Sequence, residues 1–447
     1  MTKDLTTGSV TKTMLLFACP MILGNLLQQC YNIADSFIVG KFSGSGALAA
    51  VGSAYSLMTF ITSVIIGLCM GSGTIFSVCF GKGDKAKLKN SAAASFIFIA
   101  AVTVIINIII FAAVDPILHI LNVPDDVYAM MRSYVVIVFG GLIFVFLYNY
   151  FAFLLRAIGN STVPLYFLGA AAVINIALDI LLVAVFDMGT GGAAIATVIA
   201  QAVSGVGLGA YVLIKEPELL PKKSELHITS ALVKEVTRHS FAACIQQSVM
   251  NFGILMIQGL VNSFGTAVMA AFAAAVKIDS FAYMPAQEFG NAFSIFISQN
   301  HGGGKHDRVK EGMRRAAVVS AAFCLFVSAL IFVLAKYLMQ IFIDPSEAEI
   351  INIGIGYLRI EGSFYIGIGV LFLLYGFYRG IEKPEMSLVL TIISLGTRVL
   401  LAYVLSPVPA IGVVGIWSAI PIGWFLADAV GILYIKKALQ SIQNKNG

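Results

Sequence analysis

Charge is scarce in this 447-residue chain: Asp, Glu, Lys and Arg make up 11% of it, whereas 59% of its residues are hydrophobic. Soluble domains carry about 25% charged residues, so a water-soluble enzyme of this size is excluded for lack of polar side chains to cover it. Proline (12 residues) and cysteine (6) are also rare, which argues against collagen-like, disordered and disulfide-rich secreted classes. The composition therefore predicts an all-α polytopic membrane protein.

Long apolar runs dominate the sequence and set the number of spans. A transmembrane helix needs about 20 mostly apolar residues, whereas the strands of a membrane barrel would alternate over about 10. We expect twelve transmembrane helices, near 14–40, 47–80, 91–114, 131–155, 164–186, 191–214, 240–262, 268–299, 316–342, 354–378, 386–406 and 411–435.

The positive charges predict the orientation of these spans. With both termini in the cytoplasm, 22 of the 28 Lys and Arg residues fall on the cytoplasmic side. Three lie outside and three (Lys277, Lys336 and Arg398) lie within spans. Because cytoplasmic loops of membrane proteins are enriched in Lys and Arg, we expect a multi-pass protein of the plasma or inner membrane with both termini cytoplasmic. The net charge of +5 then reports orientation and implies no nucleic-acid partner.

Residues at the ends of the expected spans recur at a spacing of nearly half the chain. Gly81-Lys82-Gly83 is matched by Gly302-Gly303-Gly304, and Arg156 by Arg379. This spacing predicts two six-helix lobes related by a pseudo-two-fold axis along the membrane normal. The expected division is 1–214 for the N-terminal lobe, 215–239 for a cytoplasmic linker and 240–447 for the C-terminal lobe. Two such lobes can rock to open a cavity alternately on either side of the membrane.

Amide and carboxyl side chains form a stripe on one face of the first span and of the seventh. Because such groups would be unsatisfied against lipid, the stripes should face a wet cavity or another helix. The first stripe includes Gln28, Asn32 and Asp35, and the second includes Gln247 and Asn251.

Acidic residues within spans are costly, and two of them stand out. Asp35 lies on the first polar stripe, and Asp179 lies one turn after Asn175 in the fifth span, with Thr197 and Gln201 one turn apart in the sixth. The membrane interior favours the neutral form of a carboxyl group, which is the property that a proton carrier needs. The second lobe has no acids at the matching places, so we expect Asp35 and Asp179 to couple transport to an ion, the alternative being buried structural carboxylates.

The remaining charged residues of the spans have weaker interpretations. Lys277 and Asp279 are expected to neutralise each other as a structural pair, and Glu288 either lines a C-terminal cavity or lies near the cytoplasmic end. Pro20, inside the first span, removes a backbone hydrogen bond and is expected to make a flexible, helix-bending point below Asp35. We find no enzyme motif, metal-ligand spacing or phosphate-binding loop, so we expect no cofactor and transport driven by an ion gradient.

Taken together, these residues resemble the multidrug and toxic compound extrusion (MATE) family over nearly the whole chain. The resemblance rests on Asn32-Ile33-Ala34-Asp35-Ser36-Phe37-Ile38-Val39-Gly40, Arg156-Ala157-Ile158-Gly159-Asn160 and Gln299-Asn300-His301-Gly302, together with the Gly-rich ends of spans two and eight. It is similar above all to the DinF-like branch, which implies an ion-coupling site at Asp35, Asn175, Asp179 and Thr197. Tyr31 and Asn149 are the implied neighbours of that site. The NorM-like branch uses acids in spans seven and ten of the C-terminal lobe, where this chain has only Glu361, near the outer end of span ten. This departure argues against a C-terminal cation site of that kind and leaves Glu288 without an assigned role.

The resemblance implies cation-coupled antiport and does not identify the substrate. We expect a monomer that carries small, cationic or amphipathic molecules, with the proton favoured as coupling ion. Sodium competes with the proton, because Asp, Asn and Thr oxygens also suit a hard cation. The expected substrate cavity is lined by Gln28, Tyr31, Asn32, Asn149, Gln201, Gln247, Asn251, Glu288 and Arg398.

Two other functions stay open at this point. A flippase for lipid-linked saccharides would need several cationic residues for pyrophosphate, for which Arg398 and Lys277 are thin support. A membrane sensor or scaffold would need a sizeable soluble domain, and the sequence offers only the linker 215–239.

Overall fold

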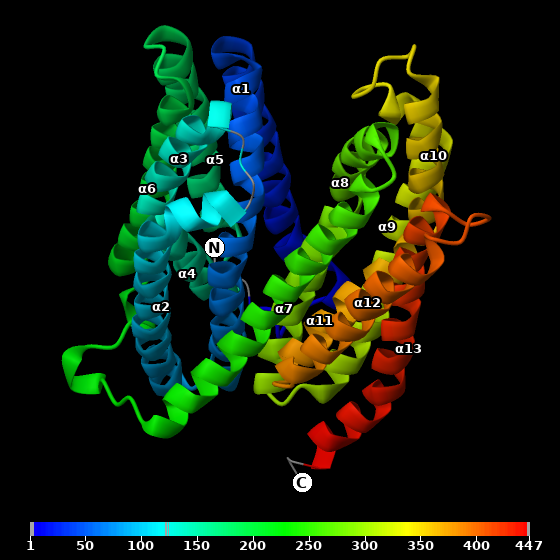
Figure 1. The fold of residues 1–447 in the computed structure, drawn as a ribbon. Coiled ribbons are helices and arrows are strands. Elements are labelled where there is room, and N and C mark those ends of the chain that lie inside the picture. The colour runs from blue at the N-terminus through cyan, green and yellow to red at the C-terminus, as the bar shows by residue number, and fades with distance from the viewer. Residues whose placement is uncertain (1–3, 121–122, 124, 445–447) are drawn as a thin grey trace. The chain divides into compact units, whose positions relative to one another are not determined.

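The computed structural model describes residues 4–120, 123 and 125–444, and regular structure there is entirely helical. Within this part of the chain, ten helices are long and apolar enough to cross a membrane, or twelve if each of two bent helix pairs counts as one span. The prediction of an all-helical, many-span membrane protein is therefore confirmed. The main helices, coloured along the chain in Figure 1, are α1 (Val10–Lys82), α2 (Lys85–Ile120), α3 (Asp125–Gly140), α4 (Leu142–Ala157), α5 (Thr162–Asp179), α6 (Gly189–Lys215), α7 (Ser230–Asn262), α8 (Thr266–Gly302), α9 (His306–Met339), α10 (Ala348–Gly362), α11 (Tyr365–Gly380), α12 (Pro384–Leu405) and α13 (Val413–Asn444).

Helix α1 contains the first two spans, Val10–Gly44 and Gly46–Lys82. Gly44 separates them with φ 86° and ψ 178°, a conformation that only glycine adopts without strain. The fourth and tenth expected spans are each broken: α3 and α4 meet at a bend of 44°, and α10 and α11 at a bend of 50°.

The helices gather into two compact units. Residues 19–244 form the body of the first unit, and residues 5–18 together with the chain from Ile245 onward form the second. The units differ from the expected division at the linker 215–239, because α1 and α7 each begin in one unit and continue into the other. The beginning of α1 belongs to the second unit and the beginning of α7 to the first.

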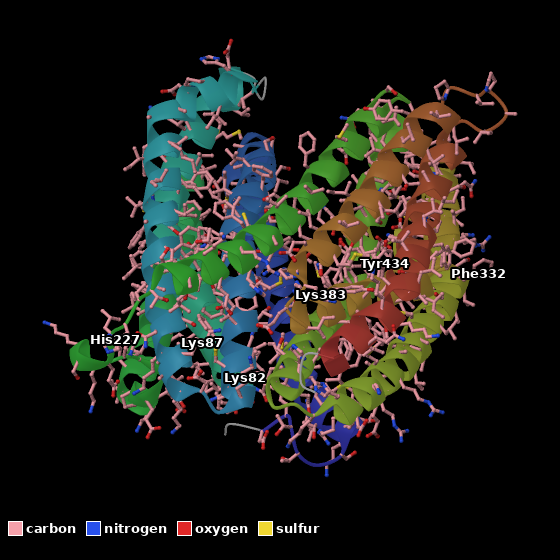
Figure 2. All side chains as sticks on the ribbon, turned by 90° about the horizontal axis from the view of Figure 1, so that it is seen from below. Lys82, Lys87, His227, Phe332, Lys383 and Tyr434 are labelled. Atoms are coloured by element: carbon pink, nitrogen blue, oxygen red, sulfur yellow. The ribbon has the colours of Figure 1, made fainter. Side chains whose placement is uncertain are left out.

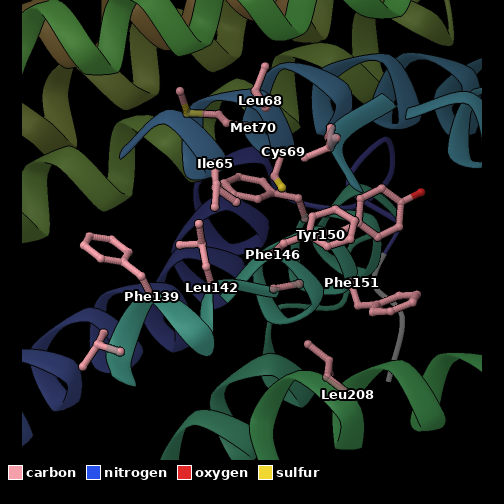
Figure 3. Packing of buried hydrophobic residues seen from close by; sticks show 14 of the residues in the cluster. Ile65, Leu68, Cys69, Met70, Phe139, Leu142, Phe146, Tyr150, Phe151 and Leu208 are labelled. Carbon is pink, nitrogen blue, oxygen red and sulfur yellow. The ribbon is translucent and has the colours of Figure 1, made fainter. Parts of the chain in front are cut away.

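The core of the first unit is aromatic and centres on α4 (Figure 3). Tyr150 is 1% exposed, and its ring lies edge-on to Phe96, Phe76 and Phe151 at centroid distances of 5.1, 6.2 and 5.3 Å. Its hydroxyl donates to the carbonyl oxygen of Ala92 at 2.6 Å. In the second unit, the fully buried Trp417 stacks on Phe272 at 5.4 Å. Each unit thus has a rigid core of its own against which its polar side chains are held.

The segment between α6 and α7 carries two short 3₁₀ helices, Pro217–Leu219 (η2) and Lys223–Glu225 (η3). It is held against the beginning of α2, where Lys85 pairs with Glu218 at 3.0 Å and Lys89 with Glu225 at 2.9 Å. The ammonium group of Lys89 holds the pKa of Glu225 below its usual range. Lys82, Lys87 and His227 lie at this end of the unit in Figure 2.

Candidate functional site

The two acids singled out in the sequence meet inside the first unit. Asp35 comes from α1 and is 9% exposed, and Asp179 is the last residue of α5 and fully buried. Their carboxyl groups lie within hydrogen-bonding reach of each other. Two carboxylates repel at such range, so this contact is favourable only when at least one of them carries a proton.

The end of α5 gives Asp179 its position. The helix changes from α to π geometry directly after this residue, over Ile180–Val185 (η1). Short π segments inside helices are found frequently at functional sites, and here the change in winding lies beside the carboxyl group. Asn175, one turn earlier, is 2% exposed, and neither its Oδ1 nor its Nδ2 has a hydrogen-bond partner among the described residues.

Tyrosines complete the surroundings of the carboxyl pair. Tyr134 of α3 is 3% exposed, its hydroxyl hydrogen-bonds with Thr197 of α6, and it lies near both Asp35 and Asp179. Tyr31, one turn before Asp35, hydrogen-bonds with Gln28 and lies near Tyr148. Sequence reasoning missed Tyr134, because a tyrosine in an apolar helix is indistinguishable from a core residue until its neighbours are known.

Other expected residues of the first unit are placed around this pair or in its helices. Gln201 is half-buried in α6, and its Oε1 has no hydrogen-bond partner within the described part of the chain. Asn149 of α4 donates to the carbonyl oxygen of Val145 in its own helix at 2.9 Å. Asn32 is half-buried, and its carbonyl oxygen accepts a hydrogen bond from the hydroxyl of Ser36 at 3.0 Å. Pro20 lies inside α1, which continues through it as a helix.

The polar residues expected in the C-terminal lobe fall into two separate groups. Gln247 lines a small pocket of about 10 Å³, room for about one water molecule, with Gln246, Gln287 and Arg379. Glu288 lies next to that pocket: Asn291 donates to its Oε1 at 3.2 Å and accepts from Arg379 at 3.0 Å. Asn251 is one turn farther along α7 and donates to the carbonyl oxygen of Gln247 at 3.1 Å.

Arg398 belongs to the second group, away from that pocket's lining. It lies near Asp279 and Glu361, which are both 3% exposed. Tyr365 donates to Asp279 Oδ1 at 2.5 Å, and Tyr357 hydrogen-bonds with Glu361. The second unit therefore holds two buried acids beside one arginine, an arrangement that the sequence did not reveal because the residues come from three helices.

The expected pairing of Lys277 with Asp279 is wrong. Residues two positions apart on a helix point in different directions. The ammonium group of Lys277 lies 5.9 Å from the centre of the Phe342 ring, which is within the range of a cation–π contact. Arg398 thus lies beside two acids and Lys277 over an aromatic ring, surroundings that do not favour binding of a pyrophosphate group.

The comparisons with known proteins agree with this architecture. The MatE family model matches residues 20–181 and 240–404. The chain is 31% identical to the probable multidrug resistance protein YpnP of Bacillus subtilis over 88% of its own length and 87% of that protein. It is 25% identical to the probable multidrug resistance protein NorM of Thermotoga maritima over 91% of its own length and 88% of the relative, and 24% identical to the FAD transporter of Shewanella oneidensis over 94% and 92%.

Solved structures show the same fold. A multidrug resistance MATE family transporter of the MOP superfamily in an outward-facing conformation superimposes with a TM-score of 0.92 over 98% of both chains at 22% identity. A MOP superfamily transporter from Pyrococcus furiosus gives a TM-score of 0.92 at 23% identity, again over 98% of both chains. The family model covers most of the chain in two matching halves, so this chain belongs to the MatE family, the ion-coupled multidrug and toxic compound extrusion transporters of the membrane, and is not an enzyme.

Proposed function

We propose that this transporter exports small cationic or amphipathic molecules in exchange for protons, and that Asp35 and Asp179 carry the protons. The contact between their two buried carboxyl groups is the observation that carries the proposal. Because the pair is stable in this geometry only with a proton between the two groups, loading and release of that proton change the local structure. Asn175, Thr197 and Tyr134 supply the polar neighbours that replace water around the pair.

Proton entry from outside neutralises the pair, and proton release to the cytoplasm leaves two like charges that separate. The separation acts on α1 through Asp35 and on the α5–η1 junction through Asp179. Pro20 is the place where α1 bends in response, because its backbone lacks one hydrogen bond. In this proposal the expelled substrate leaves past Gln28, Tyr31 and Asn32, which are among the residues expected to contact it.

The energy available sets the limit of such an exchange. One pH unit is worth about 1.4 kcal/mol per proton, and 100 mV about 2.3 kcal/mol per charge. Exchange of one proton for one monovalent cation is electroneutral, so one pH unit sustains about a tenfold gradient of substrate. A neutral substrate or a second proton would raise that limit.

The similarities support a broad substrate range, and the positions of the two acids support the proposed branch of the family. Two of the relatives above are named multidrug resistance proteins, which favours apolar, drug-like cations as substrates here. The placement of both acids in the first unit favours the DinF-like branch. Sodium is the second candidate for the coupling ion, because the oxygens of Asp35, Asp179, Asn175 and Thr197 are hard ligands.

Efflux of a fluorescent cation from proteoliposomes tests the proposal. Under an imposed pH gradient we expect Asp35→Asn and Asp179→Asn each to lower the rate at least tenfold, because an amide cannot take up a proton. Asp428→Asn is the matched control, since Asp428 is a 5% exposed acid in a span of the second unit, and it should stay within about twofold of the unmodified protein.

Three results would contradict parts of the proposal. Full pH-driven efflux by both Asp35→Asn and Asp179→Asn would show that these residues do not carry the proton. Efflux driven by a sodium gradient at constant pH, and abolished by the same variants, keeps the site and replaces the ion. Loss of activity in Asp428→Asn alone moves the coupling to the second unit.

A further inference from the structure

The stretch before α1 is held by side chains from the turn between α8 and α9 and from the start of α9. Arg308 of α9 donates from Nη1 to the carbonyl oxygen of Gly8 at 2.7 Å, and from Nη2 to those of Leu5 and Thr7 at 3.1 Å each. Lys305 donates to the carbonyl oxygen of Thr6 at 2.8 Å and to its Oγ1 at 2.9 Å. Four consecutive carbonyl oxygens are thus each bound by a cationic side chain.

Two residues of the Gln299-Asn300-His301-Gly302 motif extend this contact. Gln299 Oε1 accepts from the backbone N–H of Leu5 at 3.2 Å, and Asn300 Nδ2 donates to the carbonyl oxygen of Leu5 at the same distance. Both amide residues are fully buried, and so is the side chain of Leu5. We call Gln299, Asn300, Lys305 and Arg308 the N-terminal clamp.

Contacts within α8 and α9 hold the Arg308 side chain in position to bind the backbone. Its Nε donates to Asn300 Oδ1 at 3.0 Å, and its guanidinium group lies 5.7 Å from the centre of the Phe296 ring. Because the guanidinium group is planar, the hydrogen bond from Nε and the contact of its face with the Phe296 ring fix the direction of its remaining N–H groups. Gly8, at φ 71°, turns the chain so that three carbonyl oxygens converge on that group.

The clamped segment continues into a helix that changes units. Residues 5–18 belong to the second unit, and α1 from Cys19 onward belongs to the first. Pro20 lies directly after this change, and Asp35 lies about four turns farther along the same helix. One helix therefore connects the carboxyl pair of the first unit to an attachment point on the second.

The repeat places a similar attachment on α7. Residues 230–244 belong to the first unit, where Lys87 pairs with Glu235 at 2.9 Å and Ser72 with Ser240 at 2.8 Å. Lys87 and Arg308 are separated by the same offset as Gly81 and Gly302 of the repeat. The two crossing helices are thus each held near their beginnings by residues at matching places of the two copies.

We propose that the N-terminal clamp consists of positioning residues for transport: it fixes the cytoplasmic end of α1 to the second unit, so that the rearrangement of α1 on proton loading at Asp35 is transmitted to that unit. The inference rests on the proposed function. A helix transmits movement only while both its ends are attached. Without the clamp, the first turns of α1 come loose and absorb the rearrangement, and the carboxyl pair still binds its proton.

The test uses the full chain with Arg308→Gln, which removes the charge and the fork. We expect the maximal rate of pH-driven efflux to fall at least fivefold, while the KM and the affinity for the fluorescent cation in detergent stay within about twofold. Arg308→Lys keeps the charge without the fork and should recover part of the rate. Arg314→Gln, on an exposed residue of the same helix, is the matched control and should transport normally.

Lys305→Gln provides an independent variant that leaves Arg308 and Asn300 in place, and its rate should fall in the same direction. Normal maximal rates in both Arg308→Gln and Lys305→Gln would overturn the inference. So would a loss of rate that is matched by an equal loss of substrate affinity, because that pattern means a structural defect. If the unmodified protein shows no pH-driven efflux, the proposed function itself fails, and the two failures are thereby distinguished.

Discussion

Tyr134 is the residue whose part in the site becomes visible only in three dimensions. It lies in α3, directly before the apolar run 135–139, and its hydroxyl hydrogen-bonds with Thr197 beside Asp35 and Asp179. Its counterpart in the repeat is Tyr357, which hydrogen-bonds with Glu361 in the second unit. The same residue type thus stands beside buried acids in both copies, but the acids come from different helices.

Tyr134→Phe should slow pH-driven efflux about fivefold, because the ring still fills its space and one hydrogen bond worth about 1 kcal/mol is lost. The measurement is the initial rate of efflux from proteoliposomes across a pH series. Tyr357→Phe is the matched control and should change the rate by less than twofold. The reverse pattern would assign the coupling to the second unit.

Helix breaks repeat along the chain as faithfully as residue types do. Four pairs of backbone positions with positive φ recur at the offset of the repeat, as do the bends between α3 and α4 and between α10 and α11. One pair departs in residue type, since the place of Gly159 (φ 84°) is taken by Glu382 (φ 61°) in the second copy. The recurring pairs are Gly44 and Gly265, Gly83 and Gly304, Gly159 and Glu382, and Gly189 and Gly412.

The beginning of α7 packs so closely on the second part of α1 that only glycine fits at two positions of α1, one helical turn apart. A Cβ atom at Gly71 would overlap the backbone carbonyl of His239, and one at Gly67 the backbone of Cys244. We expect Gly71→Ala to destabilise the protein by about 1–3 kcal/mol, the usual effect of overpacking. Thermal unfolding in detergent measures this.

Gly52→Ala is the control for that substitution, because it lies on the same helical stretch with nothing within 4 Å of its added Cβ. It should leave the protein unchanged or stabilise it by roughly 0.5–1 kcal/mol, since alanine favours the helix over glycine. Equal effects of the two substitutions would mean that the α1–α7 contact is not close in solution.

At the scale of the whole molecule, the distribution of basic residues makes the orientation testable. The linker 215–239 and the segment 303–315, which joins α8 to the first turns of α9, carry five Lys and Arg residues each. The turn between α9 and α10 (340–347) carries none. The positive-inside rule therefore predicts that 340–347 lies outside the cell and the linker inside.

Labelling of introduced cysteines measures that orientation. In a variant without the exposed Cys19 and Cys30, a membrane-impermeant maleimide should label Ser346→Cys in intact cells and Ser224→Cys only after permeabilisation. Both serines are exposed, so access depends on the side of the membrane. Labelling of Ser224→Cys in intact cells would reverse the orientation.

Composition and periodicity were sufficient to determine the class of this protein. Scarce charge and long apolar runs leave only helices in a membrane, because every backbone polar group there must be satisfied within its own segment. A repeated pattern of Gly and Arg marks the two copies, because helix ends depend on local residue types. Asp35 and Asp179 also stood out on their own, since a carboxyl group in an apolar span is costly wherever it lies.

Only the tertiary structure decided which polar groups meet. It placed Asp35 next to Asp179, with Tyr134 beside both. It also showed that Arg398 and Glu361, and not Lys277, are the charged neighbours of Asp279. It further showed what the motif residues Gln299 and Asn300 do: they bind the backbone of Leu5, which lies almost 300 residues earlier in the sequence. Such contacts depend on the packing of helices distant along the chain, and no local pattern of residues encodes them.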